Sequence, residues 1–172
     1  MRTEKNSNIY LVGPMGAGKT TIGSTLAKQL RRRFYDSDQE IEIRTGAKIP
    51  LIFELEGEEG FRKRETQVIK ELTDLEQIVL ATGGGAVLAE ENRIRLKDHG
   101  MVIYLHADIE QLYTRTSKDN SRPLLNSADP KQVLKNLMDV REPLYREVAD
   151  HIVNTGDKPI SKILKEVLQL IS

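Results

Sequence analysis

The sequence contains no cysteine, and this absence excludes several kinds of site at once. Disulfides, thiolate metal sites and a cysteine nucleophile are all ruled out. The chain also lacks an excess of either charge, because 26 Lys and Arg residues are balanced by 26 Asp and Glu residues. Such a chain has no general attraction for a nucleic-acid backbone or an anionic membrane. We therefore expect neither as a partner and expect ligands to be recognised at local sites.

Long apolar segments are missing as well. Residues 1–8, MRTEKNSN, lack the apolar stretch of a secretory signal, and the longest apolar runs are shorter than the roughly 18 residues needed to span a membrane. These features predict a cytoplasmic location. The length of 172 residues, with 38% hydrophobic and 30% charged residues, is typical of one globular domain covering residues 1–172.

Short β-rich apolar segments alternate with segments of helical spacing. The expected strands are residues 8–12, 33–38, 78–82, 101–105 and 151–154. The expected helices are one after the first strand, 38–46, two within 49–72, 91–100, 108–116, 129–150 with an irregularity at Pro143, and 161–171. In the first helix, Ile22, Leu26 and Leu30 recur every four residues and predict one buried face. This alternation predicts an α/β fold with a parallel sheet.

Residues 13–20, GPMGAGKT, match the pattern G-x-x-x-x-G-K-[ST] between a predicted strand and a predicted helix. The three glycines would let the backbone curl so that its amide hydrogens converge on phosphate oxygens. Lys19 would reach the β and γ phosphates, and the hydroxyl of Thr20 would ligate Mg²⁺. A glycine-rich turn that matches by chance is the alternative interpretation.

A phosphate loop indicates a nucleotide and leaves the reaction open. A GTPase would need the guanine-reading pattern NKxD, which is absent; TSKD at residues 116–119 has a different order. Motors and large ATPases usually occupy a longer chain. A small phosphotransferase is therefore the leading class, and a nucleotide-sensing regulatory module is an alternative from another class.

Two carboxylates and a glycine cluster follow the second and third predicted strands. Asp36 and Asp38 would project to the same side of an extended chain, and Gly83–Gly85 would form a platform without side chains. If both strands flank the first, these groups face the phosphate loop. One carboxylate could hold Mg²⁺, and the other could orient an acceptor hydroxyl. Helix caps or tight turns are the alternatives, and for Asp108, a rival metal-anchoring acid, we favour a cap.

Several arginines also have two interpretations. Arg31–Arg33 could form a phosphate patch, or could end a helix, where cations suit the negative end of the dipole. Residues 62–64, RKR, would by themselves be taken for a solvated helix face. Residues 117–129 form a polar, turn-rich loop of a length that is usually functional or mobile. The three histidines, His99, His106 and His151, have no metal-ligand spacing, so we expect structural or surface roles.

Six motifs in this order and spacing resemble the shikimate kinase family. They are GPMGAGKTTIG, FYDSDQEIEIRTG, LEGEEGFRKRE, TGGG, RPLL and REPLYREVA, and the similarity extends from about Ile9 to the C-terminus. The resemblance implies a P-loop fold of the nucleoside monophosphate kinase type, with a five-stranded parallel sheet flanked by helices and a mobile lid. It also implies MgATP-dependent phosphorylation of the 3-hydroxyl of shikimate, in the route to chorismate and aromatic amino acids.

The resemblance further implies roles for individual residues at the acceptor. Asp38 would bind shikimate hydroxyls as base or orienter, and Asp36 with Thr20 would place the metal. Arg62 and Arg141 would grip the substrate carboxylate, because a planar guanidinium pairs with a carboxylate through two parallel hydrogen bonds. The further acceptor-site residues would be Gly84, through its backbone, and Glu65, which would position the arginine. The region 38–65 would bind the substrate.

At the nucleotide, the resemblance implies contacts with Gly16, Ala17, Gly18, Lys19, Thr20, Thr21, Arg115, Arg122 and Lys158. Arg122 would act in catalysis with Lys19, carried over the phosphates by a lid at 117–129 that excludes water. Thr20 stands where serine is common and keeps the hydroxyl, whereas position 158 varies in the family. ATP and shikimate would be the ligands of a monomer. A gluconate kinase on the same fold is the nearest rival.

Overall fold

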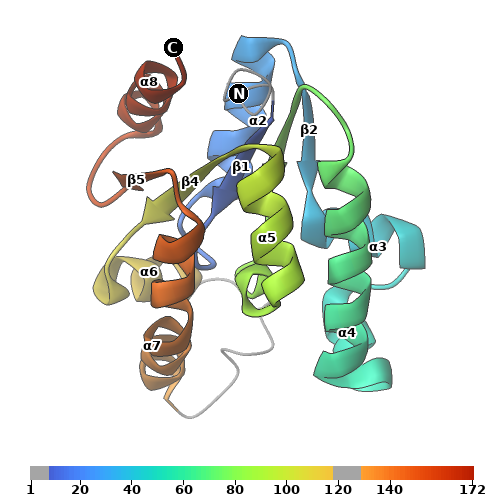
Figure 1. Ribbon diagram of the computed structural model, residues 1–172. Helices are drawn as coiled ribbons and strands as arrows, with labels where there is room; N and C mark the ends of the chain where they lie inside the picture. Colours follow the sequence, from blue (N-terminus) through green and yellow to red (C-terminus); the bar gives the residue numbers. More distant parts are fainter. Residues whose placement is uncertain (1–7, 118–128) are drawn as a thin grey trace.

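In a computed structural model, which describes residues 8–117 and 129–172, five strands form one parallel sheet (Figure 1). The strand order is β2-β3-β1-β4-β5. The strands are β1 Ile9–Val12, β2 Arg33–Asp36, β3 Ile78–Ala81, β4 Met101–His106 and β5 His151–Asn154. The predicted five-stranded parallel sheet is therefore confirmed.

Helices cover both faces of this sheet, as Figure 1 shows. They are α2 Lys19–Leu30, α3 Ser37–Thr45, α4 Ile49–Thr73, α5 Glu90–His99, α6 Ile109–Thr116, α7 Pro130–Val148 and α8 Ile160–Ile171, with a 3₁₀ turn, η1, at Ala86–Leu88. On one side α2 packs against β1, β2, β3 and α8, and on the other α5 and α7 pack against β4 while α4 lies along α5. Because both faces are covered, β1 and β3 consist entirely of buried apolar residues. No helix within the described ranges is long and apolar enough to cross a membrane.

The predicted helices occur with small differences. Ile22 and Leu26 of α2 are buried as expected. The run Ile49–Thr73 is interrupted at Gly57, whose φ of 72° and ψ of 179° are accessible essentially only to glycine, so two helical pieces are present as predicted. Helix α7 contains Pro143 but continues through it to Val148.

One prediction about the second strand is wrong, and a condition that we set for it is not met. The strand ends at Asp36 rather than at residue 38, so Asp38 lies in the first turn of α3 and the two carboxylates do not project from one extended strand. The physical reason is that Asp36 Oδ1 accepts a 3.1 Å hydrogen bond from the backbone N–H of Gln39 and caps α3. In addition β2 does not flank β1, because β3 lies between them.

The three arginines at the end of α2 also differ from both interpretations. Helix α2 ends at Leu30, Arg31 adopts a left-handed φ of 55° as its C-cap, and Arg33 begins β2. Only Lys28 places a cation in the last turn of α2. Arg31–Arg33 therefore form the turn into β2 rather than a phosphate patch or a helical last turn.

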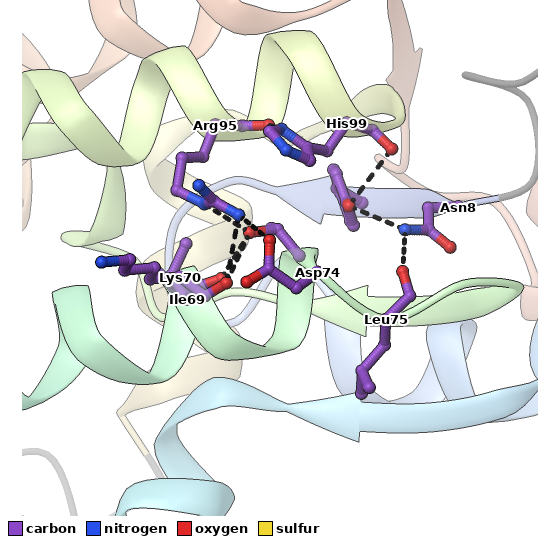
Figure 2. A network of polar contacts seen from close by, with 9 residues as sticks. Asn8, Ile69, Lys70, Asp74, Leu75, Arg95 and His99 are labelled. Carbon is purple, nitrogen blue, oxygen red and sulfur yellow. Dashed lines mark hydrogen bonds and ion pairs between the residues drawn. The ribbon is translucent and has the colours of Figure 1, made fainter.

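A polar network closes the end of the sheet where the strands begin (Figure 2). The Asn8 side chain donates hydrogen bonds to the carbonyl of Leu75 at 2.7 Å and to the hydroxyl of Tyr10 at 3.0 Å. That hydroxyl in turn donates to the carbonyl of His99 at 3.4 Å. Burial raises the pKa of Tyr10 to about 12. Arg95 on α5 extends the network to the last turn of α4. These contacts satisfy buried polar groups at the end of the sheet opposite the phosphate loop.

Candidate active site

The phosphate loop connects β1 to α2 and turns sharply at its three glycines. Gly13, Gly16 and Gly18 have φ values of 146°, 85° and 95°, in the region that favours glycine. A Cβ atom on Gly13 would lie 2.7 Å from the carbonyl oxygen of Leu105, and one on Gly16 would lie 2.8 Å from a methyl carbon of Thr116. Both the turn and the close neighbours therefore require glycine, and the backbone has the curled course that the motif predicts.

Lys19 and Thr20 begin α2 and point to different partners. Lys19 is buried, and its Nζ donates hydrogen bonds to the carbonyls of Gly13 at 2.5 Å and Pro14 at 2.8 Å, so the ammonium lies over the loop. The Thr20 hydroxyl donates a 2.6 Å hydrogen bond to Oδ2 of Asp36. The two residues predicted to place a metal are thus in direct contact, and both present the oxygen atoms that Mg²⁺ prefers.

A cavity of about 600 Å³ opens beside the phosphate loop. It collects most of the residues that the sequence singled out for an acceptor and a metal, although they come from α2, β2, α3, α4, α7 and the turn after β3. The lining residues that were predicted are Thr20, Asp36, Asp38, Arg62, Glu65, Gly83, Gly84, Gly85 and Arg141. The fold therefore brings three of the predicted carboxylates and two arginines next to the phosphate loop.

The glycine cluster after β3 is required by the charged side chains that lie against it. A Cβ atom on Gly83 would lie 2.6 Å from Oδ1 of Asp38, and one on Gly85 would lie 2.6 Å from the guanidinium carbon of Arg62. Gly84 faces Arg141, whose nearest nitrogen would be 3.4 Å from an added Cβ. The cluster is a platform without side chains, and the alternative of a purely structural turn does not explain these contacts.

Only one residue of the 62–64 basic run turns toward the cavity. The Arg62 side chain is 19% exposed, compared with 77% for Lys63 and 46% for Arg64. Arg62 donates a hydrogen bond of 2.8 Å to Oε1 of Glu65 and also pairs with Glu58 at 3.5 Å. The solvated helix face is therefore a correct description of Lys63 and Arg64 and a wrong one for Arg62.

Glu65 is a buried acid of the site whose pKa is raised. Its side chain is 1% exposed, and burial raises its pKa to about 7. The negative charge of Asp38 raises the pKa further, while the positive charges of Arg62 and Arg141 lower it. The protonation state of Glu65 therefore depends on the charges of Asp38, Arg62 and Arg141 as well as on its burial.

An apolar wall of the cavity was missed by the sequence interpretation. Ile49 and Phe53 near the start of α4 and Phe61 after its break line the cavity. The rings of Phe53 and Phe61 lie 4.8 Å apart between centroids, and the Arg62 guanidinium carbon lies 5.1 Å from the centroid of the Phe61 ring. No signal in the sequence distinguishes these residues from ordinary core residues, because they fit the helical apolar spacing.

Two predicted nucleotide contacts lie outside this cavity. Arg115 donates hydrogen bonds of 3.1 Å to the carbonyl of Gly16 and of 3.3 Å to the hydroxyl and carbonyl of Thr155, so it joins the phosphate loop to the segment after β5. Lys158 instead pairs with both carboxylate oxygens of Glu166, at 3.0 and 3.1 Å. Its contact with a nucleotide base stays a prediction.

Other predicted residues have clear places. Asp108 caps α6, accepting a 3.0 Å hydrogen bond from the backbone N–H of Gln111, as we favoured. Arg122 and residues 118–128 of the predicted lid lie outside the described residues. Among the residues that are described, no group of three or more His, Asp or Glu side chains could hold a metal ion.

Comparisons with known proteins identify one family over most of the chain. The family model described as shikimate kinase matches residues 15–172. A shikimate kinase from Nitrosococcus oceani is 60% identical over 164 residues, which cover 95% of this chain and 86% of the relative. The solved structure of a shikimate kinase from Acinetobacter baumannii in complex with shikimate has a TM-score of 0.93 and 54% identity, covering 95% of this chain and 92% of that one. For a shikimate kinase from Aquifex aeolicus the TM-score is 0.82 and the identity 39%, with 94% of each chain covered.

Proposed function

The chain belongs to the shikimate kinase family, and from this we propose that it transfers the γ-phosphoryl group of ATP to the 3-hydroxyl of shikimate. The products are 3-phosphoshikimate and ADP, on the route to chorismate and aromatic amino acids. One observation carries the proposal: Asp38, Arg62 and Arg141 line the same cavity as Thr20 of the phosphate loop. A hydroxyl-orienting acid and two carboxylate-binding cations therefore face the place where the triphosphate would end.

Arg62 and Arg141 suit the carboxylate of an acidic acceptor. They come from different helices, α4 and α7, and both border the Gly83–Gly85 platform. Each planar guanidinium can pair with a carboxylate through two hydrogen bonds. The backbone of Gly84 would lie against the bound acid, and the apolar wall would cover its ring. A neutral sugar would offer no carboxylate to the remaining N–H groups of these two guanidiniums, which disfavours it.

Transfer of the phosphoryl group requires that the reacting groups are positioned and that the phosphate charge is neutralised. The 3-hydroxyl oxygen attacks the γ-phosphorus, a new P–O bond forms, and the bond from the γ-phosphorus to the β–γ bridging oxygen breaks as ADP leaves. Asp38 orients the hydroxyl and accepts its proton. Lys19 moves onto the β and γ phosphates, where its ammonium balances the charge of the leaving oxygen. The loop amides around Gly16, Ala17 and Gly18 and the start of α2 at Thr21 hold the remaining phosphate oxygens.

The residues present also fit a magnesium ion carried with ATP. Thr20 and Asp36 would hold it, directly or through water, since their contacting side-chain oxygens suit a hard cation. When bound, Mg²⁺ neutralises phosphate charge. The contacts of Arg115 and Lys158 with the nucleotide base and the role of Arg122 remain predictions. We also propose that residues 1–172 form one domain acting as a cytoplasmic monomer, with residues 38–65 as the substrate-binding region.

Measuring ADP release with a panel of hydroxy acids tests the proposal. We expect shikimate to stimulate release strongly and gluconate to have no effect, with a phosphate ester detected on the shikimate. Failure of shikimate to stimulate release would refute the function. Stimulation by gluconate alone would identify the rival kinase, and ATP binding without turnover for any acceptor would favour a regulatory module.

A further inference from the structure

Tyr145 on α7 connects two parts of the acceptor site without lining the cavity itself. Its hydroxyl donates a 2.6 Å hydrogen bond to the carbonyl of Gly84. The guanidinium of Arg141 interacts with the same hydroxyl, and its positive charge lowers the pKa of Tyr145. Since Gly84 and Arg141 both line the cavity, one hydroxyl group contacts the glycine platform and one of the two clamp arginines.

The direction of these hydrogen bonds follows from the chemistry of a phenol. Burial raises the pKa of Tyr145 well above its usual value, so the hydroxyl keeps its proton at physiological pH. That single proton is donated to the Gly84 carbonyl, so the oxygen can only accept from Arg141. The Gly84 carbonyl therefore accepts the hydrogen bond of the Tyr145 hydroxyl, and the positive charge of Arg141 acts on the oxygen of the same group.

The surroundings restrict the movement of the Tyr145 and Arg141 side chains. The Tyr145 side chain is fully buried, and its ring lies 5.1 Å from the ring of Tyr104 between centroids. Arg141 precedes Tyr145 by four residues on α7, which places the two side chains on one face of the helix, and Arg141 is only 5% exposed. A guanidinium held in this way presents its remaining N–H groups in a fixed direction.

We propose that Tyr145 is a positioning residue for the acceptor. Its hydroxyl fixes the guanidinium of Arg141 and the backbone of Gly84 relative to each other, so that the substrate carboxylate meets a preorganised clamp. This inference rests on the proposed function and adds a residue to it. Tyr145 acts through the two residues it contacts and does not touch the acceptor.

Tyr145→Phe tests the inference because it removes the hydroxyl and keeps the ring against Tyr104. We expect the KM for shikimate to rise about five- to tenfold, the range that the loss of one or two buried hydrogen bonds produces, while the KM for ATP changes less than twofold. Steady-state kinetics with each substrate varied in turn provides both values. A purely structural role would lower stability without separating the two constants.

Tyr10→Phe is a matched control. Tyr10 is also a fully buried tyrosine whose hydroxyl accepts from a side-chain N–H, that of Asn8, and donates to a backbone carbonyl, that of His99. It belongs to the polar network around Asn8, at the end of the sheet opposite the phosphate loop. Tyr10→Phe should lower the melting temperature about as much as Tyr145→Phe and leave the KM for shikimate unchanged.

A second readout concerns recognition of the carboxylate. Wild type should prefer shikimate over its methyl ester by a large factor in kcat/KM, and Tyr145→Phe should reduce that preference severalfold. In an Arg141→Leu background, Tyr145→Phe should change the KM for shikimate by less than twofold, because the clamp on which it acts is gone.

The outcomes separate this inference from the proposed function. If wild type does not phosphorylate shikimate, the proposed function fails before any variant is compared. If wild type is active but Tyr145→Phe keeps both the KM for shikimate and the preference for the acid, the positioning role is wrong. A parallel rise of KM for shikimate in Tyr145→Phe and Tyr10→Phe would also overturn it, since it would reflect general destabilisation.

Discussion

The hydroxyl of Thr20 and the carboxylate of Asp36 are joined by a 2.6 Å hydrogen bond, which ties the first turn of α2 to the carboxyl end of β2. The other oxygen of Asp36 accepts from the backbone N–H of Gln39 and starts α3. One carboxylate therefore relates the phosphate loop to the first helix of the substrate-binding region. Changes at this contact should affect the metal and the acceptor together.

Thr20→Val should lower kcat about 100-fold and raise the magnesium concentration needed for half-maximal activity, because valine keeps the shape of threonine and removes the ligand oxygen. Thr20→Ser, which restores a hydroxyl, should stay close to wild type. Activity measured over a magnesium titration at fixed ATP checks this, and EDTA should abolish turnover in all three proteins. An unchanged magnesium dependence in Thr20→Val would contradict the assignment.

Lys19→Ala should reduce kcat/KM for ATP by a factor corresponding to about 3 kcal/mol, as for other preorganised groups that balance developing charge. Lys28→Ala supplies the control, since Lys28 is an exposed lysine in the last turn of the same helix. Its kinetics should match wild type. Near-normal turnover of Lys19→Ala would show that Lys19 does not have the proposed catalytic role.

Arg141→Leu should raise the KM for shikimate about 100-fold, the order expected when hydrogen bonds to a charged partner are lost, and should change the KM for ATP much less. Arg141→Lys should recover part of the loss, because an ammonium keeps the charge without the planar geometry. Equal effects on the two substrates would argue against a carboxylate clamp.

Gly83→Ala should lower kcat/KM for shikimate at least tenfold, because the new Cβ would lie 2.6 Å from Oδ1 of Asp38 and displace it. Gly100→Ala is the matched control, since its new Cβ would also lie 2.6 Å from a neighbour, a ring carbon of Tyr10, but away from the cavity. Both variants should be less stable in urea unfolding, but only Gly83→Ala should lose activity beyond its loss of folded protein. Equal specific activities would contradict the close contact.

Glu65 should make stability depend on pH. Because burial raises its pKa from 4.5 to about 7, the folded protein holds this proton more tightly than the unfolded chain. The stabilising contribution is therefore present below pH 4.5 and is lost as the pH rises through 7, by up to about 3 kcal/mol. Glu65→Gln should lack this loss, so its free energy of unfolding should increase relative to that of wild type between pH 5 and pH 8.

Urea unfolding at several pH values measures the difference. Glu59→Gln changes an exposed glutamate of the same helix and should follow wild type at every pH. If the difference in unfolding free energy between Glu65→Gln and wild type stayed constant from pH 5 to pH 8, the pKa of Glu65 would not be raised in the folded protein.

Local features of the site were predictable from the sequence. The phosphate loop is defined by residues close together in the chain, whose backbone angles and neighbours at Gly13 and Gly16 require glycine. The helix cap at Asp108 is likewise a short-range feature, since it involves Gln111 only three residues later. The error at Asp38 was also local: the strand pattern continued to residue 38, but a hydrogen bond to the side chain of Asp36 begins a helix at residue 37.

Features that depend on distant contacts could not be predicted from spacing. Arg62 looks like its exposed neighbours in the sequence, and only its place against Gly85 and Glu65 distinguishes it. The apolar wall at Phe53 and Phe61 has the pattern of a core. Tyr145 was part of a motif, but its role required knowing that Gly84 lies beside it across the fold.

The sequence by itself determined the class of fold, the phosphate loop and the set of charged residues from which an acceptor site could be built, because periodicity and short-range backbone geometry depend on neighbours in the chain. Only the tertiary structure decided which of these residues meet. The order β2-β3-β1-β4-β5 places the turn after β3 between Asp38, Arg62 and Arg141, and burial there raises the pKa of Glu65. Burial and long-range contact arise from packing of the whole chain, and no local pattern encodes them.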